Sequence, residues 1–379
     1  MSMYDRALIS SRLLEKSASE LDIPESRYIE AEKHYTAVGE WLGRADSALA
    51  KYSPEIYPQG SFSLGTVIKP ITDRDEYDVD LVCFLNDLPQ KATSQAQLKQ
   101  MVGDRIKQNE TYKSILDKEG RRCWTLNYAN EFHLDILPSI TDEQLRSSGG
   151  LHSDAILITD KNMIESEASE WPKSNPRGYI KWFKSRQSQI FQVLKSSIAE
   201  AQKVTIDEIP DYRIKTPLQI AIQILKRHRD EYFAKSNDKP ISIIITTLAA
   251  SLYRGQGEIY NAIYDILQGI DVNMVKQSDR YYIPNPTNNC ENFADKWNED
   301  PLLPKAFFEW LDAAKGTFCS RVLMKSESND IRKILTESLR VNLCDDVEAK
   351  PRMSIASAPT YIKPGNTSER KPWSMDEKY

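Results

Sequence analysis

Two short segments, 78–84 (DVDLVCF) and 131–137 (EFHLDIL), constrain the fold of this chain more than any other feature. Each alternates polar and apolar residues with the period of two that is typical of a β-strand with one buried face. In the first segment, Asp78 and Asp80 therefore share one face, while Val79 faces the core. The alternation predicts a sheet whose open face carries paired carboxylates.

The second segment repeats this pattern and supplies a third carboxylate. Phe132, Leu134 and Ile136 take its apolar face, which leaves His133 and Asp135 on the other. If the two strands are neighbours, all three aspartates meet at one spot. Such a cluster suits two Mg²⁺ ions in an in-line phosphoryl transfer, because hard divalent cations prefer oxygen ligands.

A polar loop is expected at 59–66, before the first of these strands, and it carries Gly60 and Ser61. Gly60 lets the backbone approach a phosphate closely, and the Ser61 hydroxyl can hydrogen-bond to phosphate oxygens. Taken alone, a Gly-Ser pair also fits a plain surface loop, and a DxD pair fits a solvated strand edge. Their order is more specific: the Gly-Ser pair stands 17 residues before the DxD pair, and Asp135 follows 55 residues after Asp80.

Other local patterns predict an α/β part followed by a helical part. Helices are expected over the first fifty residues and over 95–107, and a hairpin is expected over 123–137 with a two-residue Ala129-Asn130 turn. Loops dominate 141–177. Further helices are expected at 178–203, 217–234, 241–255, 258–269 and, with breaks, 304–343.

These patterns predict the α+β fold class and three regions. The first region, 1–175, is a lobe with a mixed sheet, helices on it and a long N-terminal helix. The second, 176–349, is a helical lobe. The third, 350–379, alternates prolines with polar residues, which is typical of a flexible tail.

Composition and missing motifs exclude several classes of protein. The net charge of −5 does not suit an extended duplex-binding face, which needs a basic excess. Five scattered cysteines and four scattered histidines argue against a zinc site and a disulfide framework. The chain has no GxxxxGK[ST] loop and no HRD or DFG motif, which excludes P-loop enzymes and protein kinases. It also lacks a long apolar run and a signal-peptide pattern, so it is expected to be cytoplasmic, with no membrane partner.

The segments PQGSFSLGT, EYDVDLVCF and FHLDILPS together resemble the signature of the polymerase-beta-like nucleotidyltransferase superfamily. Within it, the chain is similar to bacterial relatives of cyclic GMP-AMP synthase, the CD-NTases of CBASS anti-phage systems. Further similar segments lie at 171–182, 216–230 and 283–297, so the resemblance covers most of 57–297. It implies a bilobal fold whose helical lobe resembles that of oligoadenylate synthase.

The resemblance also implies roles for individual residues. Gly60 and Ser61 form the loop that binds the donor triphosphate, flanked by Gln59. Asp78 and Asp80 bind both metals, and Asp135 holds the metal that activates the acceptor hydroxyl. Two residues of the helical lobe are candidates for contacting the triphosphate, namely Lys226 and, more weakly, Ser242. The alternative for Lys226 is a solvated lysine on an exposed basic face formed by 226–229.

The implied activity is synthesis of a cyclic di- or trinucleotide, with purine bases, from NTPs in anti-phage signalling. Two Mg²⁺ or Mn²⁺ ions per active site are the implied cofactors. ATP is the expected substrate, with GTP or another NTP as alternatives. The expected partners are a protein regulator or a nucleotide-activated effector, whereas duplex nucleic acid is not expected to activate the enzyme because no zinc-binding thumb is present. Two other functions stay open: a linear-product or tailing nucleotidyltransferase, and a catalytically silent nucleotide sensor.

Overall fold

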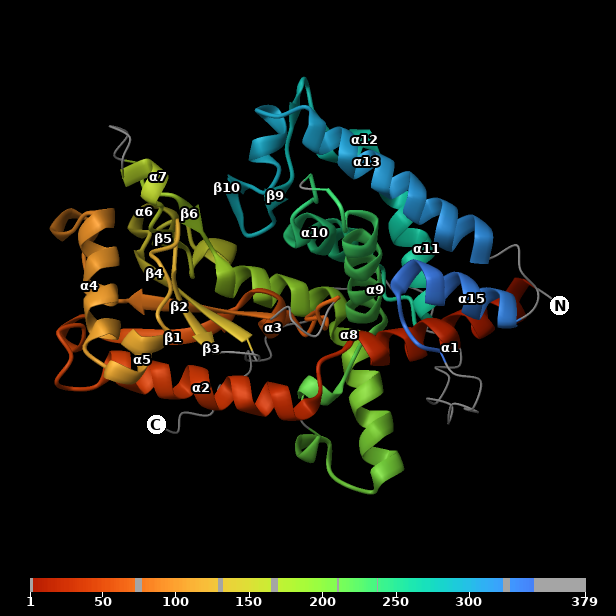
Figure 1. Ribbon diagram of the computed structural model, residues 1–379, viewed down its shortest axis with the longest axis horizontal. Coiled ribbons are helices and arrows are strands. Elements are labelled where there is room, and N and C mark those ends of the chain that lie inside the picture. Colours follow the sequence, from red (N-terminus) through yellow and green to blue (C-terminus); the bar gives the residue numbers. More distant parts are fainter. Residues whose placement is uncertain are drawn as a thin grey trace.

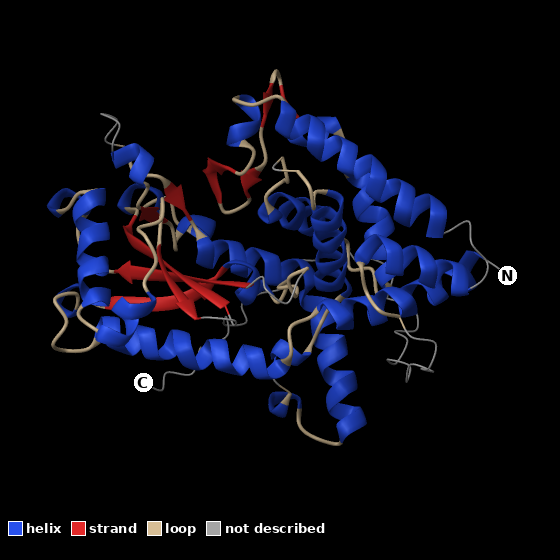
Figure 2. Cartoon of the chain, viewed as in Figure 1, coloured by secondary structure: helices blue, strands red, loops and turns tan. Residues whose placement is uncertain are grey.

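The sheet predicted from the alternating segments is the centre of the N-terminal lobe in the computed structural model (Figures 1 and 2). The structure describes residues 3–71, 77–128, 132–164, 170–209, 211–236, 238–322 and 328–343. Six strands form this sheet in the order β1-β2-β4-β5-β6, with β3 paired to β4. Among the strand pairs of this sheet in the described residues, β2–β4 is parallel and the others are antiparallel. The strands are β1 (Pro54–Gln59), β2 (Tyr77–Leu85), β3 (Trp124–Tyr128), β4 (Phe132–Thr141), β5 (Ile156–Ile158) and β6 (Lys173–Ser174).

One face of the sheet is covered by helices α2 (Glu25–Gly43) and α4 (Gln95–Lys107), which contact its central strands. The apolar side chains of β2 and β4 that alternate with the aspartates pack into one core with Val38 of α2 and Leu98 of α4. The opposite face carries the aspartates and, next to them, a smaller apolar cluster that includes Val82, Phe84 and Leu137. Shorter helices complete this lobe: α3 (Gly60–Leu64), α5 (Glu110–Ile115), α6 (Glu143–Arg146) and α7 (Lys161–Ile164).

The second lobe is built around α9 (Pro217–Tyr232), whose side chains from 217 to 229 are all buried. The N-terminal helix α1 (Met3–Leu21) packs against α9, α11 and α15 and contributes to this core. The other helices are α8 (Pro176–Gln202), α10 (Ser242–Leu252), α11 (Ile259–Gly269), α12 (Val272–Val275), α13 (Leu302–Ala314), the π-helical η7 (Lys315–Arg321) and α15 (Ser328–Leu339).

Four short strands belong to the helical lobe, and two of them, β9 and β10, lie toward the sheet (Figure 1). They form two antiparallel pairs, and β10 contacts β6 of the first lobe. The strands are β7 (Lys276–Gln277), β8 (Arg280–Tyr281), β9 (Pro284–Asn285) and β10 (Asn288–Asn292).

The α+β class, the mixed sheet and the helical second lobe are confirmed, but three local predictions are wrong. The expected polar loop at 59–66 begins at the end of a strand, β1, and contains a short helix, α3. The hairpin turn is not two residues long, because Tyr128 pairs with Phe132 and three residues separate them. The expected loop region 141–177 contains β5 and β6. The boundaries of the lobes stay predictions, and the expected tail at 350–379 lies outside the described residues.

In the part of the chain that the structure describes, no helix has the length and apolar character needed to cross a membrane.

Candidate active site

A row of polar residues runs straight across four strands on the open face of the sheet. Gln59 at the end of β1 is paired with Asp80 of β2, and Asp80 is paired in turn with Asp135 of β4. Thr125 of β3 stands opposite Asp135 on the far side. Asp78, two residues before Asp80, lies on the same face, as the alternation predicts.

The three carboxylates repel one another strongly because they lie close together and partly out of water. Burial, followed by the charges of Asp135 and Asp78, raises the pKa of Asp80 to about 7. Burial and the charge of Asp135 also raise the pKa of Asp78. The protein itself therefore does not supply enough positive charge to stabilise the ionised form of both carboxylates. A bound cation would supply that charge.

The donor chemistry of this cluster fits Mg²⁺ or Mn²⁺, since all three side chains offer carboxylate oxygens. The side chains do not, however, form a closed set of ligands: among the described residues, no three acidic, histidine or cysteine side chains come together in metal-binding geometry. Asp135 Oδ1 also accepts a 2.5 Å hydrogen bond from Thr125 Oγ1. The sequence did not identify Thr125, which orients the third carboxylate.

Gly60 brings the backbone of α3 directly against Asp80. Its φ is +64°, and a Cβ placed on it would overlap Oδ2 of Asp80 and lie 3.0 Å from Cγ. Only glycine combines this left-handed conformation with so close an approach. Ser61 follows in the first turn of α3, where helix N–H groups have no partner within the helix. The structure thus brings Gln59, Gly60 and Ser61 to the carboxylate row.

Lys226 lies in the interior of the protein. It is 6% exposed, and its Nζ donates a 2.8 Å hydrogen bond to the carbonyl oxygen of Thr66. Burial and the nearby Arg229 lower its pKa to about 8, and the charges of Asp80 and Asp78 oppose this shift. Lys226 is therefore within electrostatic reach of the carboxylates.

The exposed basic face expected at 226–229 is wrong, because all four residues are buried. Arg227 donates to the carbonyl oxygens of Lys69 and Pro70. Burial lowers the pKa of His228 to about 4. Arg229 donates to Ser242 Oγ at 2.8 Å, so Ser242, the weaker triphosphate candidate, already has a partner in the helical lobe.

The chain segment after α3 is tethered to the helical lobe through its main-chain carbonyl groups. In addition to Lys226, three side chains before or within α9 donate to this segment: Lys215 to Gly65 at 3.0 Å, Gln219 to Leu64 at 2.9 Å and Gln223 to Val67 at 2.7 Å. The sequence analysis missed these residues. Their spacing of four places them on one helical face. The sequence does not show that this face contacts the main-chain carbonyl groups of the segment after α3.

Gln223→Met is expected to loosen this tether while preserving the volume of the side chain. It removes the donor to Val67 and leaves a buried carbonyl oxygen without that partner, which costs about 1–3 kcal/mol of unfolding free energy. We also expect kcat/KM to fall by about 3- to 10-fold, because a misplaced loop positions the reacting groups poorly. Urea denaturation and initial rates test both effects.

Gln95→Met is the matched control for that substitution. Gln95 is also buried and donates to a main-chain carbonyl, that of Glu170, but it lies on α4, away from α3. It should lose stability without the change in kcat/KM. Equal kinetic losses in the two variants would contradict a positioning role for Gln223.

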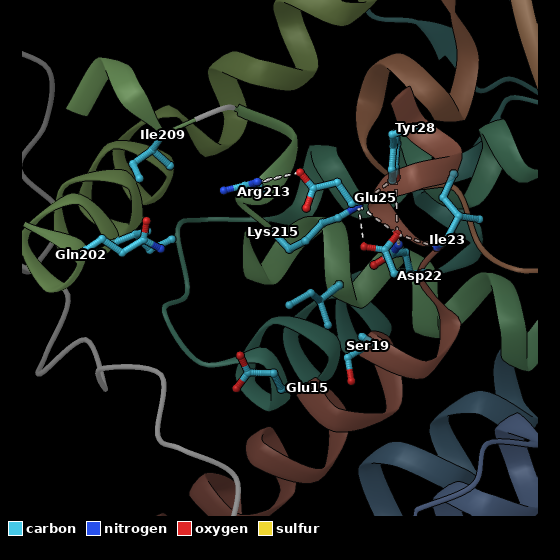
Figure 3. A pocket seen from close by; sticks show the side chains of 14 residues that line it. Glu15, Ser19, Asp22, Ile23, Glu25, Tyr28, Gln202, Ile209, Arg213 and Lys215 are labelled. Atoms are coloured by element: carbon cyan, nitrogen blue, oxygen red, sulfur yellow. Dashed lines mark hydrogen bonds and ion pairs between the residues drawn. The ribbon is translucent and has the colours of Figure 1, made fainter. Parts of the chain in front are cut away.

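Two cavities accompany these elements. The larger, about 490 Å³, is shown in Figure 3 and contains none of the three carboxylates. Four of its charged lining residues form two ion pairs, Arg213 with Glu25 and Lys215 with Asp22. The smaller, about 220 Å³, is lined by Gln59, Gly60 and Asp80 together with residues from the start of the helical lobe. The smaller cavity, although it is half the size, is the one at the chemically active residues.

Comparisons with known proteins identify relatives of this chain. A family model described as the nucleotidyltransferase domain of cyclic GMP-AMP synthase DncV-like proteins matches residues 54–138, which contain the Gly-Ser pair and all three aspartates. A curated c-di-GMP synthase from Roseivirga ehrenbergii is 34% identical over 330 residues, which is 82% of each chain. The cyclic dinucleotide synthase CdnG of Bradyrhizobium diazoefficiens is 24% identical over 308 residues, covering 76% of this chain and 70% of the relative.

The fold is also that of a solved structure. The CD-NTase CdnG of Bradyrhizobium diazoefficiens, in complex with GTP, superposes with a TM-score of 0.65 at 22% identity. The match covers 88% of this chain and 98% of that one.

Proposed function

Because the chain belongs to the CD-NTase family of nucleotidyltransferases, we propose that it condenses two molecules of GTP into cyclic di-GMP at the carboxylates of β2 and β4. It is a cyclic oligonucleotide synthase, like its curated relatives. The choice of GTP is supported by the c-di-GMP synthase at 34% identity and by the GTP complex of CdnG. ATP, the substrate expected from the sequence, is the alternative.

The observation that carries this proposal is the row formed by Gln59, Asp80 and Asp135, with Gly60 against Asp80. We assign Asp78, Asp80 and Asp135 as the residues that hold two Mg²⁺ or Mn²⁺ ions. When bound, such ions neutralise phosphate charge and lower the pKa of an attacking hydroxyl. The raised pKa values of Asp78 and Asp80 support this assignment, because a cation removes their mutual repulsion.

The residues around the row bind and orient the substrate in this proposal. The backbone at Gly60 and the hydroxyl of Ser61 hold the donor triphosphate, with Gln59 shaping the end of β1. Lys226 balances the charge of the phosphates from beneath α3, where it already binds Thr66. Ser242 contributes from the start of α10. Thr125 keeps Asp135 oriented toward the acceptor side.

The reaction follows from these positions. A ribose hydroxyl of one GTP attacks the α-phosphorus of the other, the bond to the β-phosphate oxygen breaks, and pyrophosphate leaves. The hydroxyl proton passes to solvent. Repeating the transfer between the two ends of the linear intermediate closes the ring. Catalysis here is positioning and charge stabilisation, because no covalent bond to the protein is needed.

We further propose that the product acts in anti-phage signalling through a nucleotide-activated effector, under the control of a protein regulator. The overall charge of −5 supports this mode of control over duplex nucleic acid.

Incubation with each NTP alone and in pairs, with Mg²⁺ or Mn²⁺, tests the proposed activity. After phosphatase treatment, mass spectrometry is expected to detect cyclic di-GMP from GTP alone. A product that forms only when ATP is present would contradict the choice of GTP. Linear products, which lose their terminal phosphates to phosphatase but keep the internal phosphodiester bond, would indicate the linear or tailing alternative, and GTP binding without turnover would indicate a silent sensor.

A further inference from the structure

A single carboxylate lies among the residues that line the small cavity on the side of the helical lobe. Glu291 of β10 lines the same space as Asp80 and Gly60. Between them the lining is largely apolar and includes the aromatic rings of Tyr179 and Phe293. A largely apolar slot with the catalytic Asp80 at one side and a second carboxylate, Glu291, at the other has the composition of a selective ligand site.

Glu291 is held firmly by neutral hydrogen-bond donors. Ser174 Oγ of β6 donates to its two oxygens, at 3.3 and 3.2 Å, and Asn285 Nδ2 of β9 donates to Oε2 at 2.8 Å. Asn285 cannot easily turn, because its Oδ1 accepts from both N and Oγ1 of Thr287. The position of the carboxylate is therefore fixed before any ligand binds.

The charge of Glu291 is not neutralised by a cation. The basic residue whose charge acts on it is Arg122, which is engaged in an ion pair with Asp160. In the described residues Glu291 forms no ion pair, and its hydrogen bonds are those to Ser174 and Asn285. Burial raises the pKa of Glu291. A carboxylate in this situation gains from any ligand that presents N–H donors.

Guanine presents such donors side by side, as N1–H and the N2 amino group on its Watson–Crick edge. Adenine presents an acceptor at N1 and no donor on C2. We infer that Glu291 reads the guanine edge of a GTP bound in the small cavity, with Tyr179 and Phe293 contacting the ring. This inference rests on the proposed function, and it names the residue that selects GTP over ATP.

A purely structural role for Glu291 is the competing interpretation, because it links β6 of one lobe to β9 and β10 of the other. The two roles differ in what Glu291→Gln changes. Glutamine keeps the size of the side chain and can still accept from Ser174. It replaces one carboxylate oxygen, an acceptor, by an amide N–H donor. One guanine N–H group would then face another N–H group, whereas the acceptor at N1 of adenine would gain a donor. If Glu291 recognises the base, Glu291→Gln therefore changes the preference between the two nucleotides. If Glu291 only links the two lobes, the affinity for both nucleotides falls equally.

The test is calorimetric binding of non-hydrolysable GTP and ATP analogues to the full chain, with Glu309→Gln on the exposed face of α13 as the matched control. For Glu291→Gln we expect GTP-analogue affinity to fall by roughly 10- to 100-fold, while ATP-analogue affinity holds or rises. Glu291→Asp keeps the negative charge on a shorter side chain, so the carboxylate lies farther from the ligand. This variant should lose GTP-analogue affinity without gaining ATP-analogue affinity. The control should resemble wild type.

Two outcomes, both with an unchanged ratio of the two affinities, would overturn the assignment: equal losses for both analogues in Glu291→Gln, or no change for either. Either would leave the proposed function intact if wild-type enzyme still forms cyclic di-GMP. Conversely, a changed ratio in a protein that makes no cyclic product would support the base-reading role and contradict the proposed function. The binding measurement therefore tests the role of Glu291, and the turnover measurement tests the proposed function independently.

Discussion

Asp80→Asn is expected to reduce cyclic dinucleotide formation by on the order of 10³-fold or more, while making the metal-free protein more stable. Activity falls because the central carboxylate of the row, paired with both Gln59 and Asp135, is lost. Stability rises because the substitution removes a charge that its neighbours disfavour. A gain of stability with a loss of function separates a functional carboxylate from a structural one.

The pH dependence of this effect has a defined sign. The pKa of Asp80 is about 7 in the folded protein and 3.8 for an ordinary aspartate, so between these values the folded state binds more protons than the unfolded state. The free energy of unfolding of the wild type therefore falls as pH rises from 4 to 7, and Asp80→Asn lacks this fall. Its advantage should grow by on the order of 2 kcal/mol between pH 5 and pH 8.

Urea denaturation in EDTA at the two pH values measures this difference. Added Mg²⁺ should then stabilise the wild type and have little effect on the variant. Asp87→Asn is the matched control, because Asp87 is exposed just beyond the end of the same strand. Wild-type activity in Asp80→Asn, or destabilisation at pH 8, would show that Asp80 is not a metal-binding carboxylate.

The acidic row was predictable because the core imposes it. Val79 and Leu134 must be buried, so the strand alternation forces Asp78, Asp80 and Asp135 to the open face. Parallel pairing then fixes Asp80 opposite Asp135. The period of two and a buried face are enough to place the three aspartates on one face, whereas their meeting in one row also depends on the pairing of β2 with β4.

Register across the hairpin was not predictable from the same pattern. A two-residue turn at Ala129-Asn130 would place Thr125 opposite Leu134, whereas the observed register places it opposite Asp135. A slip of one residue exchanges the faces of a strand pair, so the partner of the third carboxylate was hidden. Strand β1 was missed for a different reason: Pro54 and Pro58 discourage a strand assignment, but β1 is at the edge of the sheet, where proline is tolerated.

For the basic residues 226–229 of α9, the local sequence predicts exposure to solvent, whereas the structure buries them. Four consecutive polar residues normally indicate a solvated helix face. Here α9 is packed by α1, α10, α11, α13 and α15, and its polar groups find partners in the loop after α3 and in neighbouring helices. Those partners are far away in sequence, so only the tertiary structure identifies them.

Gly60→Ala is expected to lower kcat by on the order of 10²-fold and to destabilise the protein by more than the about 1–2 kcal/mol of a left-handed alanine. The added Cβ would overlap Oδ2 of Asp80, so Asp80, the loop or both must move. Steady-state rates and urea denaturation measure the two effects. Gly150→Ala is the matched control, because Gly150 begins a short helix (Gly150–His152) as Gly60 does, has a similar φ of +59° and has nothing within 4 Å of its added Cβ.

Removing the atoms that clash isolates the contact itself. In an Asp80→Ala background the side-chain oxygen no longer meets the new Cβ, so the stability cost of Gly60→Ala should fall toward that of Gly150→Ala. The coupling free energy of this double-mutant cycle measures how tightly the phosphate loop is packed on the carboxylate row. A coupling near zero, or an active Gly60→Ala enzyme, would mean that the close approach of α3 to Asp80 is not required for catalysis.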